Sequence, residues 1–482
     1  MGAAMPIFHR IPNAFSRRHG ILMICCISLF LVSLDNSIVN VALPAMSEDI
    51  GARITDLQWI VDAYTLVLAS LLILGGSLGD RFGRKPVFMC GVTLFGLGSL
   101  LCSFAPSPSL LVAARIFQAV GGAMLNPVAM SIIANTFTDE RERAMAIGVW
   151  GAVNGLGTAA GPLLGGLLVS MLGWRSVFWI NVPIALVGVV LTFLFVPNSK
   201  ALKPRRFDIP GQLSMLVFLA SAIGAIIEGP RIGWLSPHVL LIAVLAIAAL
   251  AVLLVWEART TEPLIDLKYF RDPAFSAAIA SCVVAFTSIG GFMFLNTLYL
   301  QNTRGLPPLA AGTATLPVAL MTIVFSTVSG KLVASTGPRT PLAASGLSFA
   351  LAAIMLYLLP EQASLAYMML IYAIFGIGSG LVNAPITNTA VSGLPPGQAG
   401  VAAGIASTGR QAGTSLGVAI AGSIIACHAH DGGTAVGSST DASRPMWLLI
   451  VAFGLLIGAL SMLIDRQSRC ETSIENVQTK GD

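Results

Sequence analysis

Long apolar stretches separated by short polar segments make up most of this chain. Each stretch holds about 20 mostly apolar residues, which is the length a helix needs to cross the hydrocarbon core of a bilayer. The pattern therefore predicts an all-α polytopic membrane protein, and an even number of spans places both termini on one side. The fourteen predicted spans are residues 20–43, 57–78, 86–105, 109–132, 144–170, 174–196, 210–228, 236–256, 274–300, 309–332, 341–360, 365–390, 399–427 and 446–464.

Basic residues are distributed unevenly between the two sets of connecting segments. If the N-terminus is cytoplasmic, the inner segments carry 20 of the 27 Lys and Arg residues and the outer loops carry five. Cytoplasmic loops are enriched in Lys and Arg, so this bias predicts that both termini are cytoplasmic. The compact loops are typical of a multi-pass protein of the bacterial cytoplasmic membrane.

Composition excludes a soluble enzyme, a secreted disulfide-rich domain and a disordered chain. Hydrophobic residues make up 55% of the chain and charged residues 10%, whereas a soluble protein carries roughly 25% charged residues. The net charge of +5 comes from scattered loop residues, so we expect no nucleic-acid partner. The seven cysteines lack metal-site spacing, and no phosphate-binding loop is present, so we expect no metal, no cofactor and no ATP-driven step. The spans contain no catalytic constellation, which argues against an enzyme.

Two sequence patterns recur at nearly the same offset. The segment 76–85 returns in a degenerate form at 330–339, about 254 residues later, and a glycine triplet returns about 252 residues later. Both echoes correspond to a shift of eight spans and indicate an internal duplication. We therefore predict six helices in residues 1–199, an inserted pair in 200–262 with a basic lead-in, and six helices in 263–482. The two glycine triplets are Gly157, Gly161, Gly165 and Gly409, Gly413, Gly417.

Duplicated helical halves are typical of transporters, in which the substrate site lies near the midplane between the repeats. Small residues four positions apart allow two helix backbones to approach closely. In the fifth and thirteenth spans, such a face either lets the two halves rock or provides ordinary tight packing.

Six short motifs follow one another along the chain, and together they carry a resemblance. The chain resembles the fourteen-helix drug:proton antiporter branch of the major facilitator superfamily over essentially its whole length. One departure is Ala119, which stands where the fourth-span motif usually has glycine. The motifs are residues 34–44, 76–85, 115–121, 157–166, 174–183 and 410–413.

The resemblance implies a fold, a function and roles for two motifs. It implies the major facilitator fold and a secondary active exporter, driven by protons, that moves small amphiphilic compounds by alternating access as a monomer. Export of one endogenous metabolite, antibiotic or siderophore is the alternative. The loop motif is implied to act as a gating latch and comprises Gly76, Asp80, Arg81, Gly83, Arg84 and Lys85. The antiporter motif comprises Gly157, Gly161, Pro162, Gly165 and Gly166.

Three charged residues are predicted at a similar depth in the membrane. At 1.5 Å per residue, Asp35 lies about 12 Å from the outer end of its span, Asp62 about 8 Å and Arg115 about 9 Å. We expect these side chains to face a common cavity, with Gln118 beside Arg115 because i and i+3 residues are neighbours. Asp35 is the predicted principal proton-coupling carboxylate, and Asp62 a second acid or an attractor of cationic substrate. The resemblance implies that Arg115, with Asp35, takes part in proton coupling. The alternative is a static Asp–Arg pair that joins helices.

Polar and aromatic residues within the spans are candidates for lining a substrate cavity, which is usually apolar with a few polar groups. Arg410 lies near the midplane and is a candidate substrate or acid partner from the second half. The resemblance implies an acid in the tenth span of some members of the branch, whereas the ninth and tenth spans here contain none, which weakens the case for divalent cationic substrates. Glu228 ends the seventh span and suits an interfacial structural role. The cavity candidates are Asn40, Tyr64, Gln118, Asn126, Asn154, Phe292, Asn296, Tyr299, Asn388 and Arg410.

Overall fold

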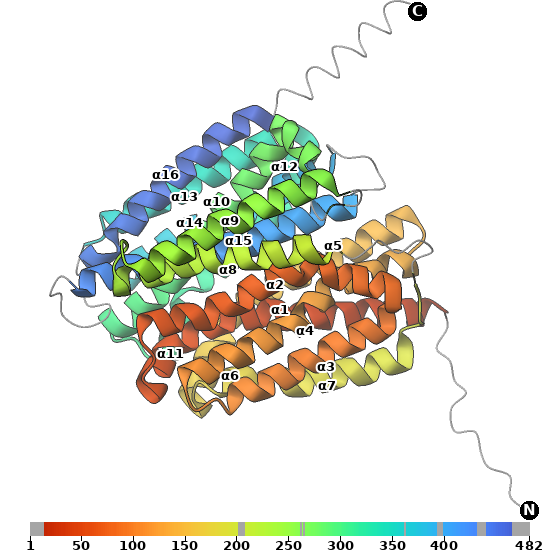
Figure 1. The fold of residues 1–482 in the computed structure, drawn as a ribbon, viewed down its shortest axis with the longest axis horizontal. Coiled ribbons are helices and arrows are strands. Elements are labelled where there is room, and N and C mark those ends of the chain that lie inside the picture. The colour runs from red at the N-terminus through yellow and green to blue at the C-terminus, as the bar shows by residue number, and fades with distance from the viewer. Residues whose placement is uncertain are drawn as a thin grey trace, which may run out of the picture.

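The computed structural model describes residues 14–200, 208–260, 263, 266–360, 363–392, 399–430 and 440–464. These residues form a bundle of helices and contain no β-strand (Figure 1). Within this part of the chain, thirteen helices are long and apolar enough to cross a membrane. The remaining predicted span, 399–427, lies in one further long helix, α15 (Ala399–His430). The predicted all-α membrane fold is confirmed.

The first six predicted spans form seven helices. Most of these helices extend beyond the predicted apolar stretch, because a helix continues through the membrane interface before it ends. The helices are α1 (Ala14–Ile50), α2 (Ile54–Phe82), α3 (Arg84–Ser103), α4 (Pro108–Thr136), α5 (Glu140–Leu172), α6 (Ser176–Trp179) and α7 (Asn181–Phe195).

The inserted pair and the last six predicted spans follow in the same order. The pair comprises α8 (Ile209–Ile232) and α9 (Pro237–Arg259), which pack against each other. The following elements are η1 (Leu267–Arg271), α10 (Pro273–Leu298), η2 (Tyr299–Thr303), α11 (Pro308–Ala314), α12 (Leu316–Thr336), α13 (Arg339–Tyr357), α14 (Leu365–Ser392), α15 and α16 (Thr440–Ile464).

Two predicted continuous spans are interrupted in the structure. The span 174–196 is divided at Ile180 into α6 and α7, and the span 309–332 is divided at Thr315 into α11 and α12. A proline lies just beyond each break, Pro183 in the first case and Pro317 in the second. Proline has no N–H to donate to the preceding turn, so the helix loses its regular hydrogen bonding there. Both segments are still long and apolar enough to cross a membrane as single spans, so the predicted spans are kept, with one irregular turn in each.

The same pairs of helices pack in the two halves. The first helix of each half lies along the fifth (α1 with α5, and α10 with α15), and the second lies along the fourth (α2 with α4, and α12 with α14). The third lies along the sixth in the same way, as α3 with α7 and α13 with α16. The boundaries at 199 and 262 adjoin residues outside the described part and stay predictions.

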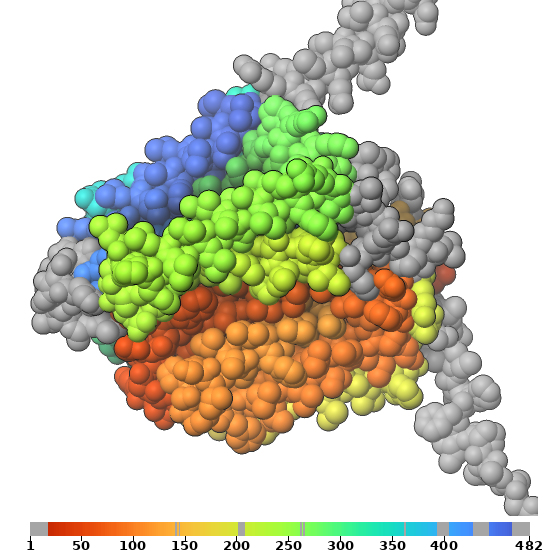
Figure 2. All heavy atoms as spheres, viewed as in Figure 1, coloured from red at the N-terminus to blue at the C-terminus, as the bar shows by residue number. Residues whose placement is uncertain are grey.

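The inserted helix α8 lies over the seam between the two halves. It packs against both α2 and α15, while its partner α9 covers it from outside (Figures 1 and 2). Within α8, Glu228 accepts a hydrogen bond from the Trp59 indole of α2 at 3.4 Å and pairs with Arg231 at 2.7 Å. Ser423 of α15 donates to the Ile226 carbonyl of α8 at 2.6 Å. Glu228 thus makes structural contacts, one with α2 and one within its own helix α8.

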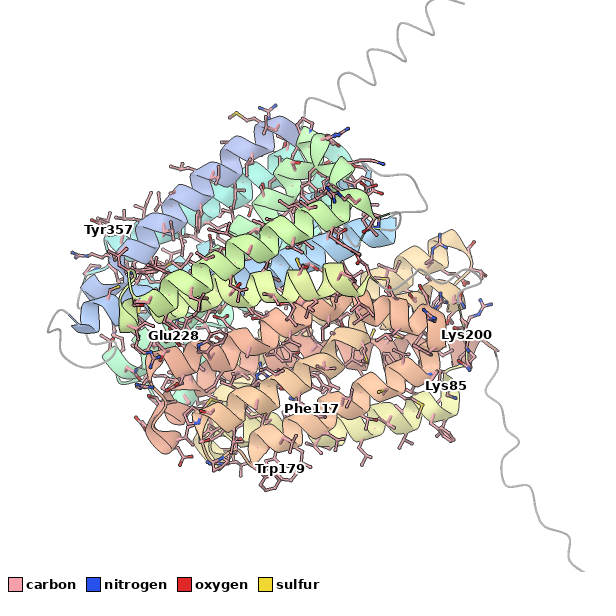
Figure 3. All side chains as sticks on the ribbon, viewed as in Figure 1. Lys85, Phe117, Trp179, Lys200, Glu228 and Tyr357 are labelled. Carbon is pink, nitrogen blue, oxygen red and sulfur yellow. The ribbon has the colours of Figure 1, made fainter. Side chains whose placement is uncertain are left out.

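Labelled side chains identify the two ends of the bundle. Lys85 and Lys200 lie at one end and Glu228 toward the other (Figure 3). We call the end with Lys85 the inner end, because the distribution of basic residues predicts it to be cytoplasmic, and the opposite end the outer end.

The two halves meet closely toward the outer end. A Cβ placed on Gly312 of α11 would lie 2.1 Å from the Pro162 carbonyl of α5, and one on Gly166 would lie 2.6 Å from the Pro308 carbonyl. Only residues without a side chain permit this backbone contact. Gln301 of η2 also donates to the Val41 carbonyl of α1 at 2.9 Å.

Candidate functional site

A buried ion pair lies inside the N-terminal half. Arg115 of α4 contacts Asp35 of α1, with 2.5 Å between Nη1 and Oδ2. The other carboxylate oxygen of Asp35 accepts bonds from Gln118 at 2.8 Å and from Asn181 of α7 at 2.9 Å. Arg115 also donates to Gln118 at 2.7 Å. The structure therefore brings Asp35, Arg115 and Gln118 into one network.

The surroundings of this pair exclude water. Asp35 and Gln118 have no exposed surface, and Arg115 is 1% exposed. The guanidinium lies 4.0 Å from the Tyr64 ring centroid and donates through Nε to the Ile60 carbonyl at 3.2 Å. A cation over an aromatic face is attracted by the ring quadrupole, more strongly when both are desolvated. Breaking such a buried pair from one side costs roughly 3–5 kcal/mol, because the remaining charge is left uncompensated.

Close packing of α3 on α4 brings Ser99 into the same network. A Cβ placed on Gly98 would lie 2.5 Å from the Gln118 Cα, and one on Gly121 would lie 2.4 Å from the Phe95 nitrogen. Because these positions lack side chains, Ser99 reaches the Gln118 amide at 2.8 Å and the Asn181 amide at 3.4 Å. Ala119 is fully buried, so the packing of α4 accommodates its methyl group where the fourth-span motif usually has glycine.

Asp62 does not join the Asp35–Arg115 network, although its depth is similar. It is fully buried and accepts a hydrogen bond from Ser415 of α15 at 2.6 Å, while its Oδ2 has no hydrogen-bond partner among the described residues. Tyr64 and Ile60, two positions away on either side, face Arg115. A step of two residues turns a helix by about 200°, so Asp62 points to the opposite side of α2. The expectation of one common cavity for the three charges does not hold in this conformation.

A second buried polar contact lies one turn from Asp62 on the same side of α2. Gln58 has no exposed surface and donates to the Ala419 carbonyl of α15 at 2.8 Å. Thr408 of α15 donates to the Ala69 carbonyl at 3.4 Å nearer the inner end. The seam between α2 and α15 therefore contains hydrogen bonds from one half to the other.

The antiporter motif has two packing roles. A Cβ on Gly161 would lie 1.8 Å from the Ser37 hydroxyl of α1, and one on Gly157 or Gly165 would lie 2.8 or 2.9 Å from an α1 side chain. Pro162 and Gly166 instead face α11 of the other half. In α15, Gly413 and Gly417 lie against the α10 carbonyls of Val283 and Thr287. Each triplet thus packs the fifth helix on the first within one half, which supports tight packing rather than a sliding surface.

The loop motif lies at the inner end and joins α2 to α3. Asp80 pairs with Arg84 at 3.2 Å, and Lys85 donates to the Phe193 carbonyl of α7 at 2.7 Å. Gly83 has φ +109°, a backbone conformation that favours glycine, and the Arg84 N–H donates to the Ser199 carbonyl at 2.8 Å. Gly76 lies beside Pro127 of α4. These contacts hold the motif within the N-terminal half; its role as a latch stays a prediction.

Among the described residues well inside the predicted spans of the C-terminal half, Arg410 is the accessible charge. Its side chain is half-buried and donates to the Ser407 hydroxyl at 2.7 Å. No carboxylate lies within ion-pair distance of it in the described part of the chain.

The cavity candidates occupy different environments. Phe292 stacks on Phe375 at 4.0 Å, and Asn296 accepts a hydrogen bond from Tyr372, so both are buried between α10 and α14 rather than lining an open space in this conformation. Tyr64 is buried over Arg115. The accessible candidates are Asn154 and Asn388, which are exposed, and Asn40, Asn126 and Tyr299, which are half-buried.

Sequence reasoning assigned no role to several residues of these contacts. Asn181 and Ser99 complete the Asp35 network, and Gln58 and Ser415 bridge the seam. Asn181 and Gln58 are amides within or beside apolar spans, and that signal marks both. Ser99 and Ser415 carry no such signal, because serine is common in membrane helices.

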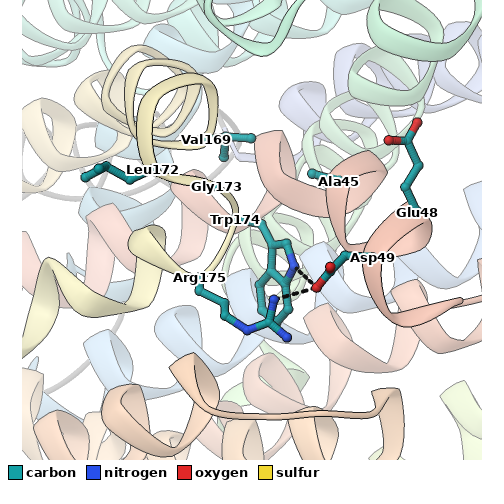
Figure 4. A pocket seen from close by; sticks show the side chains of 8 residues that line it. All are labelled: Ala45, Glu48, Asp49, Val169, Leu172, Gly173, Trp174 and Arg175. Atoms are coloured by element: carbon teal, nitrogen blue, oxygen red, sulfur yellow. Dashed lines mark hydrogen bonds and ion pairs between the residues drawn. The ribbon is translucent and has the colours of Figure 1, made fainter.

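A hollow of about 420 Å³ lies at the outer end of the N-terminal half, where α1 meets the connection between α5 and α6 (Figure 4). Asp49 accepts a bond from the Trp174 indole at 2.9 Å and from Arg175 at 2.5 Å. Since both donors belong to the same half as Asp49, this cluster fixes the loop after α5 rather than joining the halves.

Comparison with known proteins gives a consistent assignment. Residues 25–418 match the sequence profile of the Major Facilitator Superfamily. The chain is 36% identical over 400 residues to the multidrug resistance protein Stp of Mycobacterium tuberculosis, covering 83% of this chain and 74% of that protein. It is 35% identical to the tetracenomycin C resistance and export protein of Streptomyces glaucescens, covering 85% and 76% of the two chains.

Two further comparisons cover nearly the full chain. The methylenomycin A resistance protein of Streptomyces coelicolor is 32% identical, with 91% of each chain covered. The crystal structure of an auto-inhibited POT family peptide transporter superposes with a TM-score of 0.66 at 18% identity, covering 94% of this chain and 97% of that one. The latter similarity concerns the fold alone. With its profile match, its relatives and its helical bundle, the chain belongs to the major facilitator superfamily and is a transport protein, not an enzyme.

Proposed function

We propose that this protein is a proton-coupled exporter of small amphiphilic compounds in a bacterial cytoplasmic membrane. Its relatives are bacterial proteins named for multidrug resistance and for resistance to and export of single antibiotics. Export against a gradient requires a source of energy, and the sequence has no phosphate-binding loop for ATP. A proton gradient is the source that ionisable groups within the membrane can use.

The observation that carries the proposal is the pair of buried carboxyls in unlike settings. Asp35 is neutralised by Arg115, whereas Asp62 receives a single hydroxyl hydrogen bond and contacts no cation among the described residues. A buried charge without a partner is costly, so a carboxyl in the position of Asp62 is best accommodated with its proton. Opening of the seam would hydrate Asp62, the second acid, and release that proton. Asp35, the predicted principal proton-coupling carboxyl, would exchange its proton when Arg115 moves away.

The location of Asp62 links proton exchange to the movement of the halves. Its partner Ser415 belongs to the other half, and Gln58 bridges the same seam one turn toward the outer end. In alternating access, the halves separate at one end while they close at the other. This structure, with its close contacts at the outer end, corresponds to a state closed to the outside.

The test uses purified protein in proteoliposomes with an imposed pH gradient and a fluorescent amphiphile. We expect transport to follow the pH gradient, and we expect Asp35→Asn and Asp62→Asn each to abolish gradient-driven transport while leaving folded protein in the membrane. Asp56→Asn, on the same helix as Asp62 but paired with Arg53 at its exposed outer end, serves as the matched control. Full gradient-driven transport by both core variants would refute proton coupling through these carboxyls.

Dedicated export of one metabolite is the second candidate, because two of the relatives above are named for a single antibiotic. The two candidates differ in breadth. Drug-susceptibility profiles of cells expressing the protein separate them: resistance to several unrelated compounds supports multidrug export, and resistance to one compound supports the dedicated exporter.

A further inference from the structure

A stripe of polar side chains runs along the inner part of α15. It consists of Ser407, Arg410, Gln411 and Thr414, which we call the α15 stripe. All four are partly exposed, and their spacing of three and four residues places them on one side of the helix. Further toward the outer end, the positions on the same side are buried: Val418 is 1% exposed and Ala421 has no exposed surface.

The α15 stripe faces the interior of the bundle rather than lipid. Ser423 contacts α8, and Ala412 packs in the same cluster with α8. At 3.6 residues per turn, these two positions lie on the opposite side of α15 from the stripe. The stripe is flanked by the face that contacts α2 of the other half and by the face that packs on α10. A polar, accessible surface at this depth requires water, because hydrocarbon does not solvate it.

Arg410 is the accessible charge of this region. The structure places four charged residues well inside the predicted spans of its described part: Asp35, Asp62, Arg115 and Arg410. The first three are at most 1% exposed, and Asp35 and Arg115 neutralise each other. Only the guanidinium of Arg410 combines partial exposure with a bond to a neutral group, the Ser407 hydroxyl.

Apolar surface lies beside this charge. Three residues from Arg410, a Cβ on Gly413 would lie 2.5 Å from the Val283 carbonyl and 3.1 Å from the Phe286 Cβ, so α10 packs directly beside the stripe. The side chains of Val283 and Phe286 are partly exposed. A planar guanidinium binds a carboxylate through two parallel hydrogen bonds, and such charge-assisted bonds are stronger than neutral ones. An apolar body carrying one acidic group therefore matches both parts of this surface.

We propose that the α15 stripe is a substrate subsite for anionic amphiphiles, in which Arg410 binds the carboxylate and α10 contacts the apolar body. The inference rests on the proposed export function and narrows its substrate class. It assigns Arg410 as a specificity-determining residue, with Ser407 holding the guanidinium in place.

The test compares three probes that share one aromatic body: pyrenebutyrate, pyrenebutanol and pyrenebutyl-trimethylammonium. Their binding to the protein in phosphatidylcholine nanodiscs is measured by fluorescence anisotropy. We expect the anion to bind at least tenfold more tightly than the cation. Arg410→Gln should weaken anion binding roughly 10- to 100-fold, the range of a hydrogen bond to a charged group, and change alcohol binding less than threefold. Arg410→Lys should retain more anion affinity than Arg410→Gln.

Arg53→Gln is the control, because it removes one positive charge from an exposed site at the outer end. Equal or tighter binding of the cation, no measurable binding of the anion, or unchanged anion binding by Arg410→Gln would overturn the proposal. Its failure is distinguishable from failure of the proposed function. Gradient-driven transport of the cationic probe would leave proton-coupled export standing and remove the anion subsite.

Discussion

The buried contact between Asp35 and Arg115 makes a quantitative prediction about stability. The perturbations are Asp35→Asn, Arg115→Gln and the double variant. Each single substitution leaves one charge in a site that is at most 1% exposed. Arg115→Gln leaves the Asp35 carboxylate with two amide donors, Gln118 and Asn181, and no cation. Asp35→Asn leaves the guanidinium with the Ile60 carbonyl, the Gln118 side chain and the Tyr64 ring.

These remaining contacts set the expected magnitudes. Removing one member of a buried ion pair costs roughly 3–5 kcal/mol, and we expect Arg115→Gln to reach this range. Asp35→Asn should cost less, about 2–4 kcal/mol, because the aromatic face and the carbonyl still stabilise the cation. In the double variant both charges are gone and neutral amides occupy the network. We expect its loss to fall below that of Arg115→Gln alone, with a coupling free energy of at least about 2 kcal/mol.

The assay is the free energy of unfolding in mixed SDS micelles, measured for all four proteins. A cycle that includes the wild type isolates the interaction between the two side chains from their separate effects. Additive losses, with a coupling free energy below about 0.5 kcal/mol, would refute the argument that each residue neutralises the other. All three variants should also lose gradient-driven transport, so stability and not activity is the informative measurement.

Three further substitutions test, in turn, the packing of α5 on α1, the turn at Gly83 and the seam between α2 and α15. Gly161→Ala should cost about 1–3 kcal/mol in unfolding free energy, because its Cβ would meet the Ser37 hydroxyl at 1.8 Å; Gly155→Ala, with 3.8 Å to its nearest neighbour, is the control and should be nearly neutral. Gly83→Ala should lower the unfolding free energy by roughly 1–3 kcal/mol, because φ +109° strains any other residue; an unchanged value would contradict the role assigned to that turn. Gln58→Leu removes the hydrogen bond to the Ala419 carbonyl, worth about 0.5–1.5 kcal/mol. It should therefore shift the population toward the outward-open state roughly 2- to 13-fold, as measured by spin-label distances across the outer end. No shift would show that this bond does not hold the seam.

The sequence predicts the helices well and their interruptions poorly. Each apolar stretch of about 20 residues corresponds to helical structure, because an isolated backbone in lipid must satisfy its own hydrogen bonds. Hydropathy averaged over a span does not register a lost hydrogen bond, so the breaks before Pro183 and Pro317 were missed. The prolines themselves were visible in the sequence and mark both positions.

In the candidate site, the sequence predicts how deep each residue lies in the membrane but not the side of the helix on which it lies. Residue spacing gives depth along a helix, and that was sufficient to expect Asp35, Arg115 and Gln118 together. Depth does not determine which side of a helix a residue occupies, and Asp62 lies on the side of α2 away from Arg115. Neighbouring contacts of the same helix, such as those of Ile60 and Tyr64, were needed to establish its direction.

The position of α8 has a consequence for inhibition. Because α8 is hydrogen-bonded to α15 through Ser423 and to α2 through Trp59, separation of the halves along this seam requires α8 to release at least one of them. A compound that wedges between α8 and the seam from the lipid side would hold both contacts in place. Such a compound would arrest the transport cycle without resembling any substrate, and substitutions that alter substrate preference in the interior would not confer resistance to it.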